Sequence, residues 1–283
     1  MKIRYVDIDK RIAAPDINLL FPDWEAAKER VCIFSPHDDD AIIGAGYAIC
    51  AAIANGAAVY VAIFCRGNAG YSVPEQKGAI EKIREAESIK AYQKIGVREE
   101  NIIRFNYADF SVLQNIGWML DNGDEGSFKH TMTTLRKHRI TRLLVPNHYR
   151  EHIDHTAVSC IGSYDSPQAG DPILVDWGAP QLIRSVIEYP VWADLSPQDM
   201  LLSGRKAGLR GNRLVVVPED TERMICAGIA EYASQGEIIK GMIHSRKERC
   251  LSSGEYMEVY LAYDPRPKLD YRPYQEFIDE IGG

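Results

Sequence analysis

The sequence predicts an α/β protein: a Rossmann-like three-layer sandwich in which a mostly parallel sheet is covered by helices on both faces and followed by a C-terminal elaboration. Three observations support this fold class. Short apolar runs alternate with longer segments of helical periodicity, and residues 31–64 have the length and pattern of one βαβ unit. The strand-like runs are also continuously apolar, which is typical of a parallel sheet buried on both faces.

The regular part of the chain ends near residue 165. Its expected strands are 31–34, 58–64, 102–105 and 142–146, and its expected helices are 41–54, 77–95, 128–139 and 152–164. Gly96, directly after the second helix, is a natural stop for it. Each strand is thus followed by a helix, as a parallel sheet with crossover connections requires.

The C-terminal part is less regular. Residues 166–180 are rich in proline and glycine and predict a loop, after which strand-like runs follow at 182–189 and 214–217. Pro218 then begins a helix, and Gly236 bends or interrupts it.

No repeat, low-complexity tract or linker divides the chain. We therefore expect one domain over residues 1–283. Its Rossmann-like core spans 26–165, and the C-terminal strands and helix of 166–283 complete the cleft.

Composition and charge narrow the class of protein. The 283 residues carry a formal net charge of −7 without a dense basic cluster, so no nucleic-acid surface is expected. The six cysteines form no C-x-x-C pair and are typical of free thiols in a reducing compartment. The N-terminus lacks an apolar signal-peptide core, and no segment reaches the roughly 20 apolar residues of a membrane span. We expect a cytoplasmic protein with no membrane span.

Two short runs of acidic residues and histidines each follow a predicted strand. Residues 35–40 follow the first strand, and residues 152–155 follow the fourth. If the strand order reverses between these two strands, their carboxyl ends are neighbours, at the edge where open α/β sheets bind ligands. The side chains expected to meet there are His37, Asp39, Asp40, His152 and His155.

These residue types suit one metal site, because a zinc-like cation prefers imidazole nitrogens and carboxylate oxygens and takes about three protein ligands in a catalytic site. The glycines Gly44 and Gly46 in the same turn raise the alternative of a dinucleotide site. That alternative is disfavoured, because Ile49 stands where a third glycine is needed and three consecutive aspartates would repel a pyrophosphate. The glycines are better explained by close packing of the first helix on the sheet.

The two runs resemble a known family. Ser35-Pro36-His37-x-Asp39-Asp40 is similar to the H-P-D-D signature of the PIG-L/LmbE-like deacetylases, and His152-x-Asp154-His155 is similar to their second motif, H-x-D-H. The order and spacing match, and weaker similarities run from about residue 31 to about residue 260. Members of this family use zinc to remove the acetyl group from N-acetylglucosamine-type sugars. The resemblance therefore implies a zinc-dependent N-deacetylase whose partner is a small N-acetylated amino sugar or glycoconjugate.

The resemblance also implies a role for each residue. The metal ligands would be His37, Asp40 and His155, the general base would be Asp39, and the substrate would contact Arg84 and Asp109. His152 would face the oxyanion, with Asp154 fixing its orientation and raising its basicity. Zn²⁺ is the implied cofactor, and Fe²⁺ suits the same ligands.

Two residues depart from the family pattern in the first motif, and one of them is Ala41, where an acidic residue often follows the aspartate pair. Asp38 stands where the family has proline, and its charge could enter the metal shell or shift the register of the ligands. Because the H-x-D-D spacing still selects Asp39 and Asp40, we keep the assignment. We expect Asp39→Asn to abolish turnover with the metal retained, and Asp38→Asn to keep appreciable activity.

Two alternatives stay open. The protein could be a related metal-dependent hydrolase of another bond, such as an amide in thiol-cofactor metabolism or a phosphoester, or a catalytically silent metal- or sugar-binding protein of the same fold. No serine or cysteine nucleophile motif is present, so a covalent acyl-enzyme is not expected. A homo-oligomer is compatible with the sequence, which does not specify the number of subunits.

Overall fold

A nine-stranded sheet forms the centre of the computed structural model, within the residues it describes, 2–198, 204–206 and 208–282. Its strands lie in the order β2-β1-β8-β9-β7-β6-β3-β4-β5. The strands are β1 (Arg4–Asp7), β2 (Ile12–Ala14), β3 (Arg30–Ser35), β4 (Ala58–Cys65), β5 (Ile102–Tyr107), β6 (Arg142–Pro146), β7 (Ser185–Tyr189), β8 (Arg213–Val217) and β9 (Tyr256–Tyr263). The helices are α1 (Asp40–Ala54), α2 (Ile80–Lys94), α3 (Ser127–Lys137), α4 (Ile153–Cys160), α6 (Glu219–Ile229), α7 (Gly236–Ser245) and α8 (Arg272–Gly282).

The sheet is mixed, so the prediction of a mostly parallel sheet is wrong. The pairs β7–β6, β6–β3, β3–β4 and β4–β5 are parallel, whereas β9, β8, β1 and β2 extend the sheet in antiparallel pairs. Helix–strand alternation reveals only the parallel half, because antiparallel neighbours need no crossover helix between them. The strands β1, β2 and β9 therefore have no counterpart in the sequence-based prediction.

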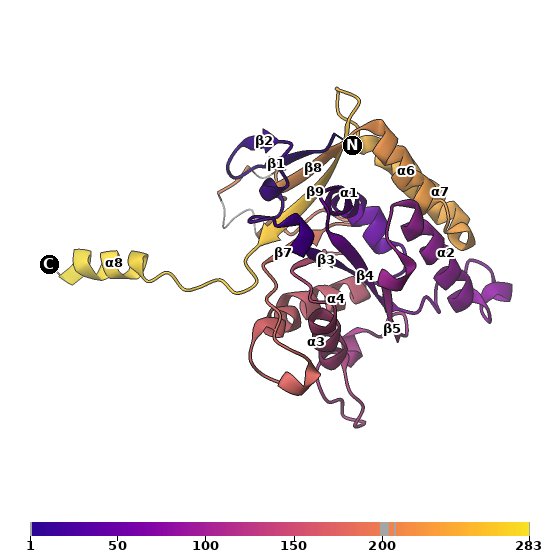
Figure 1. Ribbon diagram of the computed structural model, residues 1–283, viewed down its shortest axis with the longest axis horizontal. Helices are drawn as coiled ribbons and strands as arrows, with labels where there is room; N and C mark the ends of the chain where they lie inside the picture. Colours follow the sequence, from indigo (N-terminus) through magenta and orange to yellow (C-terminus); the bar gives the residue numbers. More distant parts are fainter. Residues whose placement is uncertain (1, 199–203, 207, 283) are drawn as a thin grey trace.

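The parallel half has the three layers expected. Val31 and Ile33 of β3 face one side and belong to a core shared with α1 and α6, whereas Cys32 and Phe34 face the other side and belong to a core shared with α3 and α4. This alternation follows from the two-residue period of a strand. Figure 1 shows α1, α2, α6 and α7 on one side of the sheet and α3 and α4 on the other.

The strand order also reverses where it was predicted to. β3 pairs with β4 on one side and with β6 on the other, so the first and fourth strands of the parallel half are neighbours. Gly44 permits α1 to approach the sheet closely, since a Cβ at this position would lie 2.6 Å from the Pro190 carbonyl oxygen. Gly46 faces Ile225 of α6 in the same way, with a Cβ expected 2.9 Å from its Cδ1. The glycines thus serve packing, as the sequence indicated.

In the described part of the chain, none of the helices has the length and apolar character needed to cross a bilayer.

Candidate metal centre and active-site cleft

A cleft of about 210 Å³ lies at the carboxyl edge of the parallel strands. Both motifs contribute to it, and its lining residues are His37, Asp39, Gly67, Ala69, Gly70, Arg84, Asp109, Phe110, His152, Trp192, Gln235, Ile238 and Met242. The loops after β4 and β5 form one wall, and α7 closes the opposite side. Ile238 and Met242 were not predicted as cleft residues, because nothing in the pattern of α7 distinguishes them from core positions.

The three implied ligands meet below this cleft. Asp40 Oδ2 lies 3.0 Å from His37 Nδ1 and 3.0 Å from His155 Nε2. Ligand atoms of all three residues fall within 4.8 Å of one another. Neighbouring ligands around a tetrahedral zinc lie roughly 3.3 Å apart, given zinc–nitrogen and zinc–oxygen bonds of about 2.0–2.1 Å. The spacing of the three side chains therefore fits a zinc-like cation.

The hydrogen bonds of His155 support this fit. Its Nδ1 lies 2.6 Å from Glu151 Oε2 and donates to that carboxylate, so Nε2 presents a lone pair. Nε2 is buried and makes no hydrogen bond with the described residues, although Asp40 Oδ2 is close. A lone pair on His155 Nε2 and a carboxylate oxygen of Asp40 that face each other at 3.0 Å are stabilised by a positive charge between them. Burial opposes a charged imidazole, but the nearby Asp40 and Glu151 carboxylates outweigh it and raise the pKa of His155 to about 9.

A second trio overlaps the first. His37, His152 and Asp154 also offer ligand atoms within 4.8 Å of one another. The oxygens of Asp154 are already engaged, because they accept hydrogen bonds from the backbone amides of Phe110 at 2.6 Å and Val112 at 3.1 Å. The trio of His37, Asp40 and His155 is therefore the better candidate for the metal.

His152 sits at the start of α4 as its N-cap. Its Nδ1 accepts a hydrogen bond from the Asp154 backbone amide at 3.1 Å, so in the neutral ring the proton is on Nε2. Burial and the neighbouring His37 lower the pKa of His152. The Asp154 carboxylate, 3.6 Å from Nδ1, acts in the opposite direction and raises this pKa, but burial and His37 outweigh it. The Asp154 backbone amide orients the ring.

Asp39 and Arg84 lie together at the cleft wall. Arg84 Nη2 donates to Asp39 Oδ1 at 3.1 Å. Burial raises the pKa of Asp39, and the Asp40 and Asp38 carboxylates add to this rise while Arg84 opposes it. Arg84 is itself buried, and its Nη1 has no hydrogen-bond partner in the part of the chain described. This buried donor belongs to a residue that lines the cleft.

Asp38 points away from the three ligands. Arg84 Nε donates to its Oδ2 at 3.1 Å, and Arg104 Nη2 donates to its Oδ1. Its backbone carbonyl accepts hydrogen bonds from the hydroxyls of Tyr92 at 2.8 Å and Tyr232 at 2.6 Å. The extra charge in the motif is thus neutralised by two arginines and does not reach the metal trio.

Asp109 lies in the cleft wall with both carboxylate oxygens engaged. They accept hydrogen bonds from the backbone amides of Gly67 at 2.9 Å and Ala69 at 2.8 Å. Asp109 therefore holds the loop after β4 in place. Its predicted contact with the substrate would be an additional role.

Glu151 is the important residue that the sequence analysis did not identify. Its carboxylate is fully buried; besides holding His155, it accepts hydrogen bonds from the backbone amides of residues 191–193 at 2.9–3.1 Å. It therefore joins the metal trio to the loop that carries Trp192. Its position four residues before His155 is the signal that could have indicated a contact.

Comparisons with known proteins agree with this geometry. The family model for GlcNAc-PI de-N-acetylase (PIG-L) matches residues 32–163. None of the curated proteins compared matches the sequence.

Three solved structures share the fold at low sequence identity. The N,N'-diacetylchitobiose deacetylase from Pyrococcus horikoshii is 18% identical, with 88% of each chain covered and a TM-score of 0.64. The conserved protein TT1542 from Thermus thermophilus is 20% identical, covering 84% of this chain and 96% of its own, with a TM-score of 0.60. GalB, the 4-carboxy-2-hydroxymuconate hydratase from Pseudomonas putida, is 13% identical, covering 86% of this chain and 99% of its own, with a TM-score of 0.59.

Both motifs lie inside the matched segment. The resemblance to the PIG-L/LmbE-like family is therefore confirmed over residues 32–163 of this chain.

Proposed function

We propose that the protein is a metal-dependent hydrolase that removes the N-acetyl group from an N-acetylglucosamine-type sugar or glycoconjugate by attack of water. The observation that carries this proposal is the meeting of His37, Asp40 and His155 beside Asp39 and His152 in one cleft. The PIG-L match supports the same chemistry.

The trio of His37, Asp40 and His155 would hold the metal, and two imidazoles with one carboxylate suit Zn²⁺, or Fe²⁺ in its place. When bound there, such an ion supplies Lewis acidity, which makes water a stronger acid and an amide carbonyl a better electrophile. Glu151 would keep His155 in the tautomer that binds the ion, because it accepts the Nδ1 proton.

Asp39 would act as the general base. It lines the cleft beside the trio, and Arg84 holds its Oδ1 in a fixed position. A carboxylate whose pKa is raised by burial takes a proton from water more readily than an ordinary aspartate does. The same group can then return that proton to the departing amine.

His152 would stabilise the oxyanion as a neutral donor. Its Nδ1 is occupied by the Asp154 amide, so Nε2–H is the donor that remains for the cleft. The lowered pKa of the ring favours this neutral form over the imidazolium.

The sugar would contact the outer part of the cleft. Arg84 Nη1 can donate to a hydroxyl or carbonyl oxygen of the substrate, because no described residue uses it. The rings of Phe110 and Trp192, which are 64% and 60% exposed, line the mouth and can pack against a sugar face. We further propose that the protein acts in the cytoplasm, where its cysteines, none of them disulfide-bonded in the described chain, stay reduced.

The test is release of acetate and free amine from a panel of N-acetylated amino sugars, with and without a chelator. Turnover should require metal and should fall by a factor of about 10²–10⁴ in Asp39→Asn, the typical contribution of a general base. Metal content, measured by elemental analysis, should not change in this variant.

Asp38→Asn is the matched control, since it removes the same charge one residue away. This variant should keep appreciable turnover when it is assayed well below its melting temperature. The reverse outcome for the two variants would contradict the assignment of the base. Metal bound without any turnover across the panel would favour the catalytically silent protein.

Hydration of a double bond is a second candidate, favoured by the fold shared with the GalB hydratase. A cation and a carboxylate base can deliver water to an alkene conjugated with a carboxylate as well as to an amide. Consumption of an unsaturated acid without release of acetate would identify this activity instead.

A further inference from the structure

The C-terminal arm, residues 264–282, leaves the body of the protein. Figure 1 shows α8 at the end of an extended segment, well separated from the sheet and its helices. Every residue from 266 to 282 is exposed. Pro265 and Pro267 restrict the backbone at the start of the arm and disfavour a helical turn there, so the segment runs outward.

The helix of this arm has an unpartnered apolar stripe. Tyr274, Phe277, Ile278 and Ile281 follow the i, i+3, i+4, i+7 spacing of one helix face. Together with Leu269 and Tyr271 ahead of the helix, each of these side chains is between 58% and 64% exposed. Charged residues occupy the opposite face, so the helix is amphipathic and lacks the surface that its apolar side requires.

The length of α8 argues that it needs a partner. It has 11 residues, and isolated helices shorter than about 12–15 residues are marginal in water. Six side chains exposing roughly 100 Å² each give about 600 Å² per arm. If two copies exchange arms, the two arms alone bury roughly 1,200 Å², which reaches the lower end of the about 1,200–2,000 Å² of a standard stable interface.

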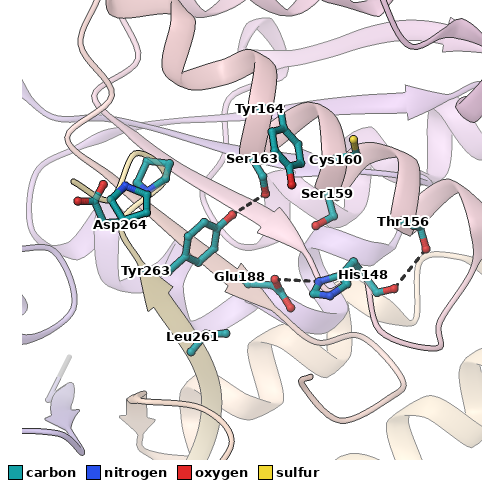
Figure 2. Close-up of a pocket in the computed structure, with 12 residues that line it drawn as sticks. His148, Thr156, Ser159, Cys160, Ser163, Tyr164, Glu188, Leu261, Tyr263 and Asp264 are labelled. Carbon is teal, nitrogen blue, oxygen red and sulfur yellow. Dashed lines mark hydrogen bonds and ion pairs between the residues drawn. The ribbon is translucent and has the colours of Figure 1, made fainter. Parts of the chain in front are cut away.

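A pocket of about 520 Å³ lies at the root of the arm. Figure 2 shows Ser163 and Tyr164 on the segment after α4 facing Tyr263 at the end of β9. Pro265 and Pro267 of the arm also line this pocket, as does Leu261. The pocket therefore combines apolar side chains with hydroxyls that can meet the polar tips of tyrosines. It lies on the side of α4 away from the metal trio and forms no part of the proposed reaction.

We infer that α8 of one copy of this chain docks, with its apolar stripe, on the root pocket of a second copy. When two such arms run antiparallel about a two-fold axis, each α8 comes to lie beside the root of the other arm, which is where the pocket is. Each chain then supplies one stripe and one pocket, so two copies satisfy both surfaces and the assembly closes.

The arm's own pocket is a poorer partner for α8. Arg266 forms two ion-pair contacts of 2.7 Å with Asp171, which fix the start of the arm on the body. Only residues 268–271 then separate this anchored part from α8, and Pro273 further restricts the turn that a return would need. Exchange with a second copy requires no such reversal.

The test measures the mass of the full chain in solution by light scattering over a range of concentrations. The wild type should show at least twice the 31.8 kDa of one chain. Phe277→Asp, in the stripe, and Tyr164→Asp, at the lip of the pocket where the side chain is 72% exposed, should each lower this mass. Gln275→Asp, beside the stripe on the same helix, adds the same charge and should leave the mass unchanged.

Both altered side chains are exposed, so the variants should keep the melting temperature of the folded body, and circular dichroism would check this. A wild-type monomer at every concentration overturns the inference. An unchanged mass in Phe277→Asp would show that the stripe is not at the interface, and an unchanged mass in Tyr164→Asp would show that the pocket is not at the interface. Either result also overturns the inference. The inference does not depend on the proposed deacetylase activity, and enzyme turnover is not one of its readouts.

Discussion

Replacing Asp38 with asparagine tests how this chain accommodates an aspartate where the family has proline. The Asp38 carboxylate is fully buried and is shared by Arg84 and Arg104. Asp38→Asn keeps the size of the side chain and the backbone carbonyl that accepts the two tyrosine hydroxyls. It removes a buried negative charge that two guanidinium groups share.

The expected loss of stability can be estimated from these contacts. Breaking a buried ion pair costs about 3–5 kcal/mol, because one charge is left unpaired. Arg84 keeps Asp39 as a second partner, and the asparagine oxygen still accepts one hydrogen bond, so we expect the lower end, about 3 kcal/mol. At about 2–4 °C per kcal/mol for a large domain, the melting temperature should fall by roughly 6–12 °C.

A double-mutant cycle with Arg104→Gln separates this pair from general disruption. The combined variant should lose less stability than the sum of the two single variants, since neither charge is then left without its partner. Thermal unfolding and elemental analysis provide the measurements. Additive losses, or an unchanged melting temperature in Asp38→Asn, would refute the proposed ion pair. Loss of the metal in Asp38→Asn alone would show that Asp38 helps to hold the ion.

The remaining predictions concern Glu151, which holds the metal-site residue His155, the close packing of Gly44 and the buried carboxylate of Glu29. Glu151→Gln should lower metal affinity by a factor of about 10–100 through the loss of the charged acceptor for His155, and chelator competition would detect it; unchanged affinity would rule out that role. Gly44→Ala should cost about 1–3 kcal/mol, because its Cβ would overlap the Pro190 carbonyl, whereas Gly78→Ala, with open space around it, should be neutral in thermal unfolding. Burial opposes the charge of Glu29, but Arg142 and Thr141 lower the pKa of this carboxyl below its ordinary value of 4.5. The ionised Glu29 therefore stabilises the folded protein above that pH, and this stabilisation is lost as the pH falls through the lowered pKa. The stability difference between Glu29→Gln and the wild type, measured in urea, should therefore be larger at pH 7 than at about pH 3, and a difference that grows on acidification would contradict the pairing.

Residue patterns alone indicated the parallel half of the sheet and the place of the site. The β3–β6 neighbourhood follows from alternating strands and helices, and motifs at the ends of those strands then have to meet. The pattern places His37, Asp40 and His155 together with Asp39 and His152 at this edge, and the family resemblance then singles out the first three as metal ligands.

Other features depend on contacts that no local pattern encodes. The antiparallel strands β1, β2, β8 and β9 join the sheet without crossover helices, so the periodicity of the chain does not reveal their partners. Glu151 was missed for a related reason: half of its role is to accept hydrogen bonds from backbone amides about 40 residues later.

The sequence by itself determined which residues gather at the carboxyl edge of the sheet. Each motif directly follows a predicted strand, and the alternation of strands and helices over many residues indicates the order of those strands. Only the tertiary structure decided which way each side chain turns once it arrives there. Asp38, Asp39 and Asp40 are consecutive, yet one meets Arg84 and Arg104, one faces the cleft, and one meets two histidines. The reason is physical: in the tight turn between β3 and α1 the backbone directs successive side chains differently, and partners from α2, β5 and α4 neutralise each charge in its own place.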